Sequence, residues 1–391
     1  MAADAATAER RKALVLVSFM NTAGAQRAAH RVATGLAARG WDAELWFLYK
    51  VAEDDFSGVP VRVLLDTKHP STWDYVKILG RTIAQMRRYR PDAVLSFLPL
   101  ASAVGQFAAV LSGVRVRVAS LRSPAPTFGR MMRRIDRLFG TTGVYTSIIA
   151  VSQAVADEAH SYPKRYRDRI SVVHNGVEPA KTKLTKSEAR AALSLPAEGP
   201  IAVSVGRLAP QKNYRFQLEI AERLSNVRLF CVGEGPDRAE LEREIETRGL
   251  SDRVTLLGSV PASDVRAAYQ AADMFIQPSL YEGQSNTLLE AMSAGLPVIV
   301  SDVPSQTETV LGGGGTDYGQ ALPLDAPDAW AEAMEKLAAD EAFAAEFSLL
   351  SLERAGQFTV AGQIDGFEAA LAPPDDRASE AGGRAALAAR D

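Results

Sequence analysis

Short apolar runs alternate with longer amphipathic segments along most of the chain. The runs in the first half cover residues 13–19, 43–48, 92–97, 114–120 and 147–152, and those in the second half cover 201–206, 228–233, 254–259, 274–279 and 296–302. Uninterrupted apolar runs of this length are typical of strands buried on both faces, and the segments between them are typical of helices. The alternation predicts an α/β architecture of parallel sheets covered by helices.

A polar, lysine-rich segment over residues 180–199 interrupts this series. A chain of 391 residues is also too long for one ordinary core. We therefore predict two doubly wound, Rossmann-like domains, residues 1–180 and 181–342, that face each other across a cleft. A C-terminal helix over about 343–371 is expected to pack back on the first domain. The tail 372–391 mixes Pro, Gly, Ala and charge and is expected to be disordered.

The composition is that of a soluble globular protein, with 47% apolar and 23% charged residues. No run approaches the roughly 18 consecutive apolar residues that span a bilayer. The run 13–19 resembles the apolar part of a signal peptide. Because this run is short and a segment with helical periodicity follows it, we predict a buried first strand instead. The single cysteine, Cys231, excludes an intrachain disulfide and favours a reducing compartment. A cytoplasmic protein is the prediction.

The net charge of −3 hides an asymmetry between the two halves. Residues 1–185 contain 27 Lys and Arg and 15 Asp and Glu, a net charge of +12, whereas residues 186–391 contain 17 and 32, a net charge of −15. The halves are expected to face different partners.

Ligands of doubly wound sheets lie beyond the carboxyl ends of the strands, so the residues after each run are the candidates for chemistry. After the run 201–206, Arg207 leaves the strand end and Lys212 follows near the start of the next helix. Arg supplies a planar fork for two oxygens and Lys a point charge, and the helix N-terminus adds to the field. This segment predicts a phosphate site, although two ordinary surface cations remain an alternative.

The segment 279–302 carries two carboxylates, Glu282 and Glu290, on either side of a predicted helix start. Ser285 or Asn286 can cap this helix, and Gly295 can end it. The first N–H groups of the helix would then point toward the same site as Arg207 and Lys212. Carboxylates beside a phosphate pocket would be repelled by the ligand unless they bind its hydroxyl groups, which a ribose or a hexose offers.

The segments "GRLAPQKN" (206–213), "VGEGP" (232–236), "EGQSNTLLE" (282–290) and "AMSAGLPVIVSD" (291–302) together resemble the C-terminal half of a family 4 glycosyltransferase of the GT-B fold. In the first half, "AGAQRAAHRVATGLAARGWDAELW" (23–46) is similar to the first glycine loop and helix of that family, and "VVHNGVE" (172–178) to the end of its first domain. The resemblance covers most of the chain.

The resemblance implies retaining transfer of a sugar from a nucleotide-sugar donor. Arg207 and Lys212 would hold the diphosphate, Glu290 would bind the ribose, and Glu282 would bind hydroxyls of the donor sugar. The catalytic groups implied are Glu282, Arg207, Lys212 and Arg122. The resemblance implies further donor-binding positions. Ser259 and Val260 would contact the base. The others are Gly24 and Ala25 in the first loop, Gly206, Gly283, and the helix start at Ser285, Asn286, Thr287 and Leu288.

The sequence departs from the family pattern in two places. Ala23 stands where many members have a first glycine before Gly24. Arg122 stands after the run 114–120, where many members have a histidine, and some branches acting on lipid-linked sugars also have an arginine there. An arginine at this place would still stabilise the transition state as a cation.

The sequence offers no cofactor or metal site. It contains no Asp-x-Asp motif, and its four histidines and one cysteine are scattered. A metal-independent transferase is therefore expected, in which cations and helix N–H groups stabilise the leaving diphosphate. The nucleotide sugar is a substrate, and a UDP-sugar is favoured over a GDP-sugar. Two alternatives remain open: a nucleotide-sugar epimerase of the same fold, and a nucleotide-sugar-binding module without turnover.

The segment 130–139 predicts a basic amphipathic helix. Its arginines fall at 130, 133, 134 and 137, the spacing of one helical face, while Met131, Ile135 and Leu138 take another. Such a helix on a basic domain suits an anionic membrane surface, although a solvated face is the alternative. We expect a glycan or polyprenyl-diphosphate-linked acceptor in bacterial surface polysaccharide assembly, peripheral binding to the inner face of the cytoplasmic membrane, and no nucleic acid partner.

Overall fold

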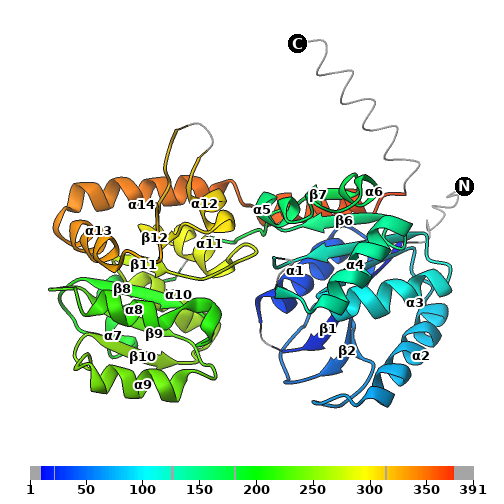
Figure 1. The fold of residues 1–391 in the computed structure, drawn as a ribbon, viewed down its shortest axis with the longest axis horizontal. Coiled ribbons are helices and arrows are strands. Elements are labelled where there is room, and N and C mark those ends of the chain that lie inside the picture. Colours follow the sequence, from blue (N-terminus) through cyan, green and yellow to red (C-terminus); the bar gives the residue numbers. More distant parts are fainter. Residues whose placement is uncertain (1–9, 22, 125–126, 180–181, 313–314, 374–391) are drawn as a thin grey trace, which may run out of the picture. The chain divides into compact units, whose positions relative to one another are not determined.

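The computed structural model describes residues 10–21, 23–124, 127–179, 182–312 and 315–373. These residues divide into two compact units (Figure 1). The first unit runs to His174 and includes the chain from Ala361 onward, and the second runs from Asn175 to Val360. The predicted domain boundary at residue 180 lies slightly beyond this division.

The first unit is built on a parallel sheet with the strand order β3-β2-β1-β4-β5-β6-β7. The strands are β1 (Lys12–Met20), β2 (Asp42–Lys50), β3 (Val61–Val63), β4 (Ala93–Phe97), β5 (Val116–Leu121), β6 (Ser147–Ala150) and β7 (Ile170–Val172). The run 13–19 is thus the central strand β1, which pairs in parallel with β2 and β4. The prediction of a buried first strand is confirmed.

Helices connect these strands on both faces of the sheet. They are α1 (Gly24–Ala38), α2 (Thr72–Tyr89), the π-helix η1 (Ala101–Gly105), α3 (Gln106–Leu111), α4 (Arg130–Thr142), α5 (Gln153–Asp157) and α6 (Lys164–Arg167). A further helix, α15 (Val360–Ala370), comes from the C-terminal part of the chain and also belongs to this unit. From β1 the chain adds β2 and β3 on one side of the sheet, and after β3 it crosses back to add β4 to β7 on the other side. Because parallel crossovers are right-handed, α1 covers one face and α2, α3 and α4 cover the other.

The second unit repeats the plan with a parallel sheet in the order β10-β9-β8-β11-β12-β13. Its strands are β8 (Ile201–Val205), β9 (Arg228–Val232), β10 (Val254–Gly258), β11 (Met274–Gln277), β12 (Val298–Ser301) and β13 (Gln320–Leu322). Its helices are α7 (Lys186–Ala192), the 3₁₀ helix η3 (Pro210–Lys212), α8 (Tyr214–Ala221), α9 (Arg238–Thr247), α10 (Ala262–Ala271), α11 (Asn286–Ser293), α12 (Pro304–Val310), α13 (Pro327–Ala339) and α14 (Glu341–Gly356). The predicted fold of two Rossmann-like domains is confirmed.

The central strands form because helices cover both of their faces. Every residue of β4, β8, β11 and β12 is buried, which matches their continuous apolar sequences. Polar side chains define helix starts instead: Ser71 and Thr185 form capping boxes at the starts of α2 and α7. Apolar runs and capping residues thus account for the element order.

The C-terminal segment differs from the prediction. One helix was expected over about 343–371, but the helix ends before Gln357, and Thr359 forms an isolated parallel β-bridge with Val177. The N–H of Val177 binds the carbonyl of Phe358 at 2.8 Å, so this tertiary bond replaces a helical one. α14 packs in the second unit against α11, whereas α15 packs in the first, where Phe367 stacks on Phe97.

The tail predicted from residue 372 falls almost wholly outside the described residues. Among the helices that the structure does describe, none combines the length and apolar character needed to cross a membrane.

Candidate functional site

The strand order of the second unit reverses between β8 and β11, which are neighbours in the sheet. The loops after these two strands carry Gly206 to Asn213 and Pro278 to Ser285. Ligands of doubly wound sheets bind at such a switch point, beyond the carboxyl ends of the strands. The structure therefore brings the two predicted motifs of the second half to the place where a ligand is expected.

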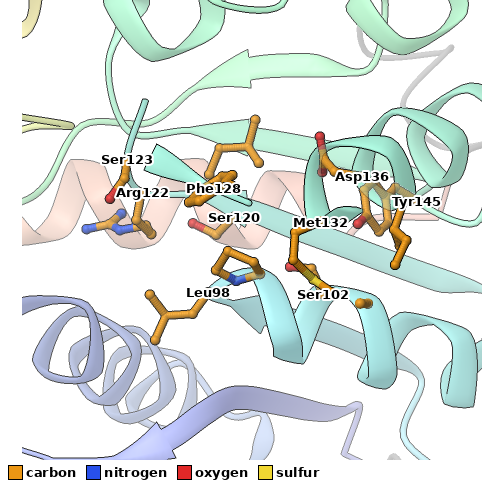
Figure 2. A pocket seen from close by; sticks show the side chains of 13 residues that line it. Leu98, Ser102, Ser120, Arg122, Ser123, Phe128, Met132, Asp136 and Tyr145 are labelled. Carbon is orange, nitrogen blue, oxygen red and sulfur yellow. The ribbon is translucent and has the colours of Figure 1, made fainter. Parts of the chain in front are cut away.

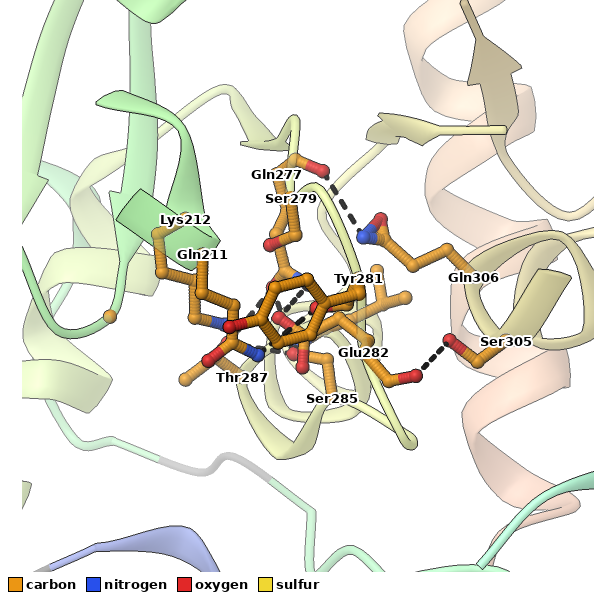
Figure 3. Close-up of polar contacts among 12 residues, drawn as sticks. Gln211, Lys212, Gln277, Ser279, Tyr281, Glu282, Ser285, Thr287, Ser305 and Gln306 are labelled. Carbon is orange, nitrogen blue, oxygen red and sulfur yellow. Dashed lines mark hydrogen bonds and ion pairs between the residues drawn. The ribbon is translucent and has the colours of Figure 1, made fainter. Parts of the chain in front are cut away.

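Lys212 and Glu282 meet at this edge of the sheet (Figure 3). The ammonium Nζ of Lys212 lies 2.7 Å from Oε1 of Glu282, and the two side chains are 15% and 9% exposed. The backbone supports the pairing, since the N–H of Leu280 binds the carbonyl of Gln211 at 2.8 Å. A cation and a carboxylate that the sequence assigned to different parts of a donor are thus directly bonded.

Glycines let the strand ends approach closely around Lys212. A Cβ atom on Gly206 would lie 2.9 Å from Cε of Lys212, and one on Gly233 would lie 1.9 Å from the carbonyl oxygen of Gly206. Gly233 also has a φ of +144°, a conformation that favours glycine. The motif "VGEGP" therefore serves to pack the loop after β9 against the loop that carries Arg207 and Lys212.

The start of α11 is held by a hydroxyl network. Ser285 caps the helix by accepting from the N–H of Leu288 at 3.3 Å, and its own hydroxyl donates to Oε1 of Gln277 at 2.8 Å. The hydroxyl of Thr287 donates to the same oxygen at 3.1 Å. The N–H of Leu288, predicted to cradle a phosphate, is thus engaged by the cap, whereas Asn286 and Thr287 stand at positions whose N–H groups have no acceptor within the helix.

Glu290 lies on α11 and contacts α10. The phenol of Tyr269 donates to Oε2 of Glu290 at 3.1 Å, and burial together with this carboxylate raises the pKa of Tyr269 well above its usual value. The phenol therefore stays protonated and fixes one carboxylate oxygen. Glu290 itself is half-buried.

The remaining predicted residues of the second unit differ in how far they are exposed to solvent. Arg207 is exposed and makes no hydrogen bond or ion pair with any residue that the structure describes. Gly283 is buried, and its neighbour Gln284 is fixed by Asn175, whose backbone N–H binds Oε1 of Gln284 at 2.6 Å. Ser259 is exposed and Val260 half-buried, directly after β10.

Gly24 and Ala25 lie in the first unit, at the start of α1 after β1. Ala23 occupies the N-cap position and offers no side-chain bond to the helix. Gln26 is buried and donates through Nε2 to the carbonyl of Phe19 at 3.1 Å, which ties the helix start to the end of β1. Gly24 itself is exposed, so its backbone is open to a ligand.

Arg122 borders a small pocket in the first unit, at the carboxyl ends of β4 and β5 (Figure 2). Its guanidinium lies 5.6 Å from the ring centre of Phe97, and burial together with the nearby charge of Arg31 lowers the pKa of Arg122. Leu98 lines the same pocket with a φ of +74°, a conformation that costs a non-glycine residue about 1–2 kcal/mol. Backbone strain of this kind clusters at functional sites.

The helix α4 lines part of this pocket. Met132 and Ile135 line it, and Asp136 closes its far end, where it accepts from the phenol of Tyr166 at 2.6 Å. Burial raises the pKa of Asp136 to about 6.

The outer side of α4 differs from the sequence prediction. The three apolar residues predicted to share one face do not share one environment: Ile135 is half-buried and lines the pocket, whereas Met131 and Leu138 are 67% and 56% exposed. They lie beside the arginines, of which 130, 134 and 137 are exposed and 133 is half-buried. The reason is that Met132, Ile135, Asp136 and Phe139 already supply the inward face.

Two residues of the site were missed by the sequence reasoning. Gln277 was included in an apolar run, and Tyr269 lies inside the helix α10 far from any motif. The one available signal was the polar Gln277 at the end of a buried strand. Nothing in the sequence singles out Tyr269, because its contact with Glu290 bridges two helices.

Two family models match the chain. Residues 185–349 match the glycosyl transferases group 1, and residues 22–181 match glycosyltransferase family 4. Among the curated relatives, the lipopolysaccharide core biosynthesis glycosyltransferase LpsE of Rhizobium meliloti is 24% identical over 87% of this chain and 88% of its own length. The 2-deoxystreptamine glucosyltransferase of Streptomyces kanamyceticus is 32% identical over 36% of this chain and 38% of its own length.

The chain spans about half or less of four of the first five curated relatives, between 38% and 50% of their lengths. Among solved structures, Anabaena Alr3699/HepE in complex with UDP and glucose is similar with a TM-score of 0.79 and 20% identity, over 92% of this chain and 98% of that one. The structure of WaaG, a glycosyltransferase involved in lipopolysaccharide biosynthesis, is similar with a TM-score of 0.70 and 17% identity, over 92% and 98%.

These solved structures share the fold. The two family models together cover both units, in the order that the motifs predicted. The chain therefore belongs to the family 4 glycosyltransferases.

Proposed function

We propose that this protein is a retaining glycosyltransferase that moves a sugar from a nucleotide-sugar donor to a glycan or lipid-linked glycan acceptor. The observation that carries the proposal is the meeting of Lys212 and Glu282, 2.7 Å apart, beside the start of α11 at the switch point of the second sheet. A cation that can bind phosphate and a carboxylate that can bind sugar hydroxyls therefore form one ion pair. A sugar phosphate is the ligand that needs both.

In the proposed reaction, the bond between the anomeric carbon and the diphosphate oxygen breaks, and negative charge develops on the leaving diphosphate. Lys212, Arg207 and the N-terminal end of α11 stabilise that charge. The acceptor hydroxyl attacks from the face that the diphosphate vacates. Its proton passes to a phosphate oxygen, and the new glycosidic bond retains the configuration of the donor. The protein cations take the place of a metal ion in this scheme.

The proposed donor contacts divide between two carboxylates. Glu290, which accepts a hydrogen bond from Tyr269, binds the ribose. Glu282 binds hydroxyls of the transferred sugar. A UDP-sugar is favoured because a relative of the same fold has been solved with UDP and with UDP-glucose. Ser259 and Val260 would contact the base.

The first unit supplies the proposed acceptor side. Arg122 stands at the carboxyl end of β5 beside a pocket lined by Leu98, Phe128 and Met132, so a cation adjoins an apolar surface. A diphosphate or phosphate attached to a lipid would use both. Gly24 and Ala25 would bring the backbone of the first loop to the distal phosphate of the donor.

The surface of α4 supports binding to an anionic membrane. Its exposed arginines, together with the exposed Met131 and Leu138, present both charge and apolar area. Further exposed apolar residues lie next to it on α3, where Phe107 stacks on Phe139 with ring centres 6.4 Å apart. A peripheral enzyme on the inner face of the cytoplasmic membrane, in bacterial surface polysaccharide assembly, fits this surface.

The test is a thermal-shift screen with UDP, GDP, ADP and their sugars, followed by product analysis with lipid-linked and soluble glycan acceptors. Binding stabilises the native state by about 2.7 kcal/mol at a hundredfold excess of ligand over Kd. A new glycoside of retained anomeric configuration supports the proposal. An epimerised donor would assign the protein to the isomerases, and an unchanged donor that still binds would make it a binding module.

A further inference from the structure

Gln277 occupies the centre of the hydrogen-bond network at the proposed donor site. It is the last residue of β11, and its side chain is 2% exposed. Its amide oxygen accepts from the hydroxyls of Ser285 and Thr287, and its amide Nε2 lies 3.4 Å from Oε1 of Glu282 (Figure 3). One buried amide thus contacts both the predicted sugar carboxylate and the predicted phosphate cradle.

The orientation of this amide follows from its partners. The carboxylate of Glu282 can only accept, so the amide nitrogen faces Glu282, and the amide oxygen faces α11, where the two hydroxyls donate to it. The backbone carbonyl of Gln277 also accepts from Nε2 of Gln306 at 3.4 Å, which fixes the end of the strand. The amide therefore has a single arrangement that satisfies its neighbours.

Glu282 has two donors on the same carboxylate oxygen, Lys212 at 2.7 Å and Gln277 at 3.4 Å. Lys212 is a cation and is attracted by any phosphate that enters the site. Gln277 is neutral and has no such competing attraction. When a diphosphate engages Lys212, Gln277 is the donor that stays with the carboxylate of Glu282.

We propose that Gln277 is a positioning residue for donor recognition: it holds Glu282 toward the sugar when Lys212 turns to the diphosphate, and it fixes the first turn of α11 through Ser285 and Thr287. This inference rests on the proposed function. The amide of Gln277 would thus link Glu282, which is proposed to bind the sugar, to the start of α11, which is proposed to bind the phosphate of the same donor.

The experiment measures the affinity ratio between a nucleotide sugar and its bare nucleoside diphosphate, using the pair that stabilises the wild type most in a panel of UDP, GDP and ADP ligands. Gln277→Met keeps the volume and removes every polar contact of the side chain. Gln277→Glu keeps an acceptor for Ser285 and Thr287 but places a second carboxylate against Glu282. The matched control is Gln217→Met, which removes another buried amide of the second unit, one bonded to Ser204 at 3.0 Å.

In both Gln277 variants we expect the affinity ratio to fall about tenfold, the effect of losing or reversing a bond to a charged group. Gln277→Glu preserves the start of α11 but adds a negative charge near the diphosphate, which weakens the nucleotide sugar and the bare diphosphate alike, so the ratio of the two affinities reports the contact with Glu282. If Gln277→Met does not fold, Gln277→Glu alone tests the proposal. Combining Gln277→Met with Glu282→Gln should lower the ratio no further than Glu282→Gln alone. The control should keep the ratio.

A wild-type ratio in folded Gln277→Glu overturns the positioning role, as does an equal loss in Gln217→Met. Neither result touches the proposed function, because the wild type would still bind and transfer. If the wild type binds no nucleotide sugar in the panel, the proposed function fails, and the assignment of Gln277 fails with it.

Discussion

Lys212 and Glu282 are bonded through Nζ and Oε1 at 2.7 Å, although 70 residues separate them in the chain. Both side chains are largely buried, so each neutralises the other in a place that water reaches poorly. A ligand that takes one of them must provide a partner for the other. Phosphate for the lysine and hydroxyl groups for the glutamate satisfy that condition together.

Arg207→Ala and Lys212→Ala should each lower the rate of transfer about 100-fold or more, because each removes charge stabilisation from the leaving diphosphate. Initial rates under limiting donor measure this. Arg228→Ala is the control, since it removes an exposed arginine at the amino end of β9, whereas the site lies beyond the carboxyl ends of the strands of the same parallel sheet. Wild-type rates in both site variants would contradict the phosphate assignment.

The same two variants should differ in stability. Arg207 is exposed without a partner among the described residues, so Arg207→Ala should leave the free energy of unfolding unchanged. Lys212→Ala leaves the buried Glu282 without its cation and should lower that free energy by about 1–3 kcal/mol. Urea denaturation of both variants checks this, and an equal stability would mean that the ion pair contributes nothing.

Glu282→Gln should impair transfer more than it impairs binding of the nucleoside diphosphate. The carboxylate is expected to contact the sugar alone, and its removal also frees Lys212 for phosphate. Calorimetric titration with nucleoside diphosphate, beside the rate of transfer, makes the comparison. A loss of diphosphate affinity as large as the loss of rate would show that this role is misassigned.

Glu290→Gln should weaken binding of the bare nucleoside diphosphate, because Glu290 is expected to bind the ribose. Tyr269→Phe should do so less strongly, since it leaves the carboxylate in place and removes the phenol that contacts Oε2 of Glu290 and the carbonyl of Thr287. In both variants the preference for a ribonucleoside over a 2′-deoxyribonucleoside diphosphate should shrink, by up to about tenfold for one bond to a charged group. An unchanged preference would place the ribose elsewhere.

Wild-type protein should float with anionic liposomes at low salt and not with neutral ones. Each cation near such a surface contributes about 1 kcal/mol, and α4 carries four arginines. Changing Arg130, Arg133, Arg134 and Arg137 to Gln should abolish flotation. The control changes four arginines of the second unit, namely Arg215, Arg223, Arg243 and Arg248. If the wild type does not float with anionic liposomes at low salt, a soluble acceptor becomes the better hypothesis.

Asp136→Asn should flatten the dependence of stability on pH between about 4 and 6. Burial raises the pKa of Asp136 to about 6 in the native protein, above its ordinary value of about 4. The native state therefore holds a proton in this range that the unfolded state has lost, and the wild type loses stability as pH rises through it. Urea denaturation at pH 4.5 and 7 compares the two proteins, and parallel profiles would contradict the shift.

The sequence by itself determined the two sheets and the ligand-facing loops. Continuous apolar runs such as 201–206 can be buried only between covering helices, and Gly206 and Ser285 mark a turn and a cap by their chemistry. Arg207, Lys212 and Glu282 were predicted as site residues because they lie in the segments that follow buried strands, where ligands of parallel sheets bind. Glu290 was predicted from its place one turn beyond Asn286 on the helix and from the family resemblance.

Only the tertiary structure decided which of these groups touch. The ion pair of Lys212 with Glu282, and the bond of Tyr269 to Glu290, join segments that local periodicity treats as independent. The break between α14 and α15, and the exposure of Met131 and Leu138, were likewise set by neighbours: Val177 takes the carbonyl of Phe358, and Met132 and Ile135 fill the inward face of α4. A sequence pattern reports the environment of each residue, but the choice of partner is made by segments far away in the chain, which meet only when the core has formed.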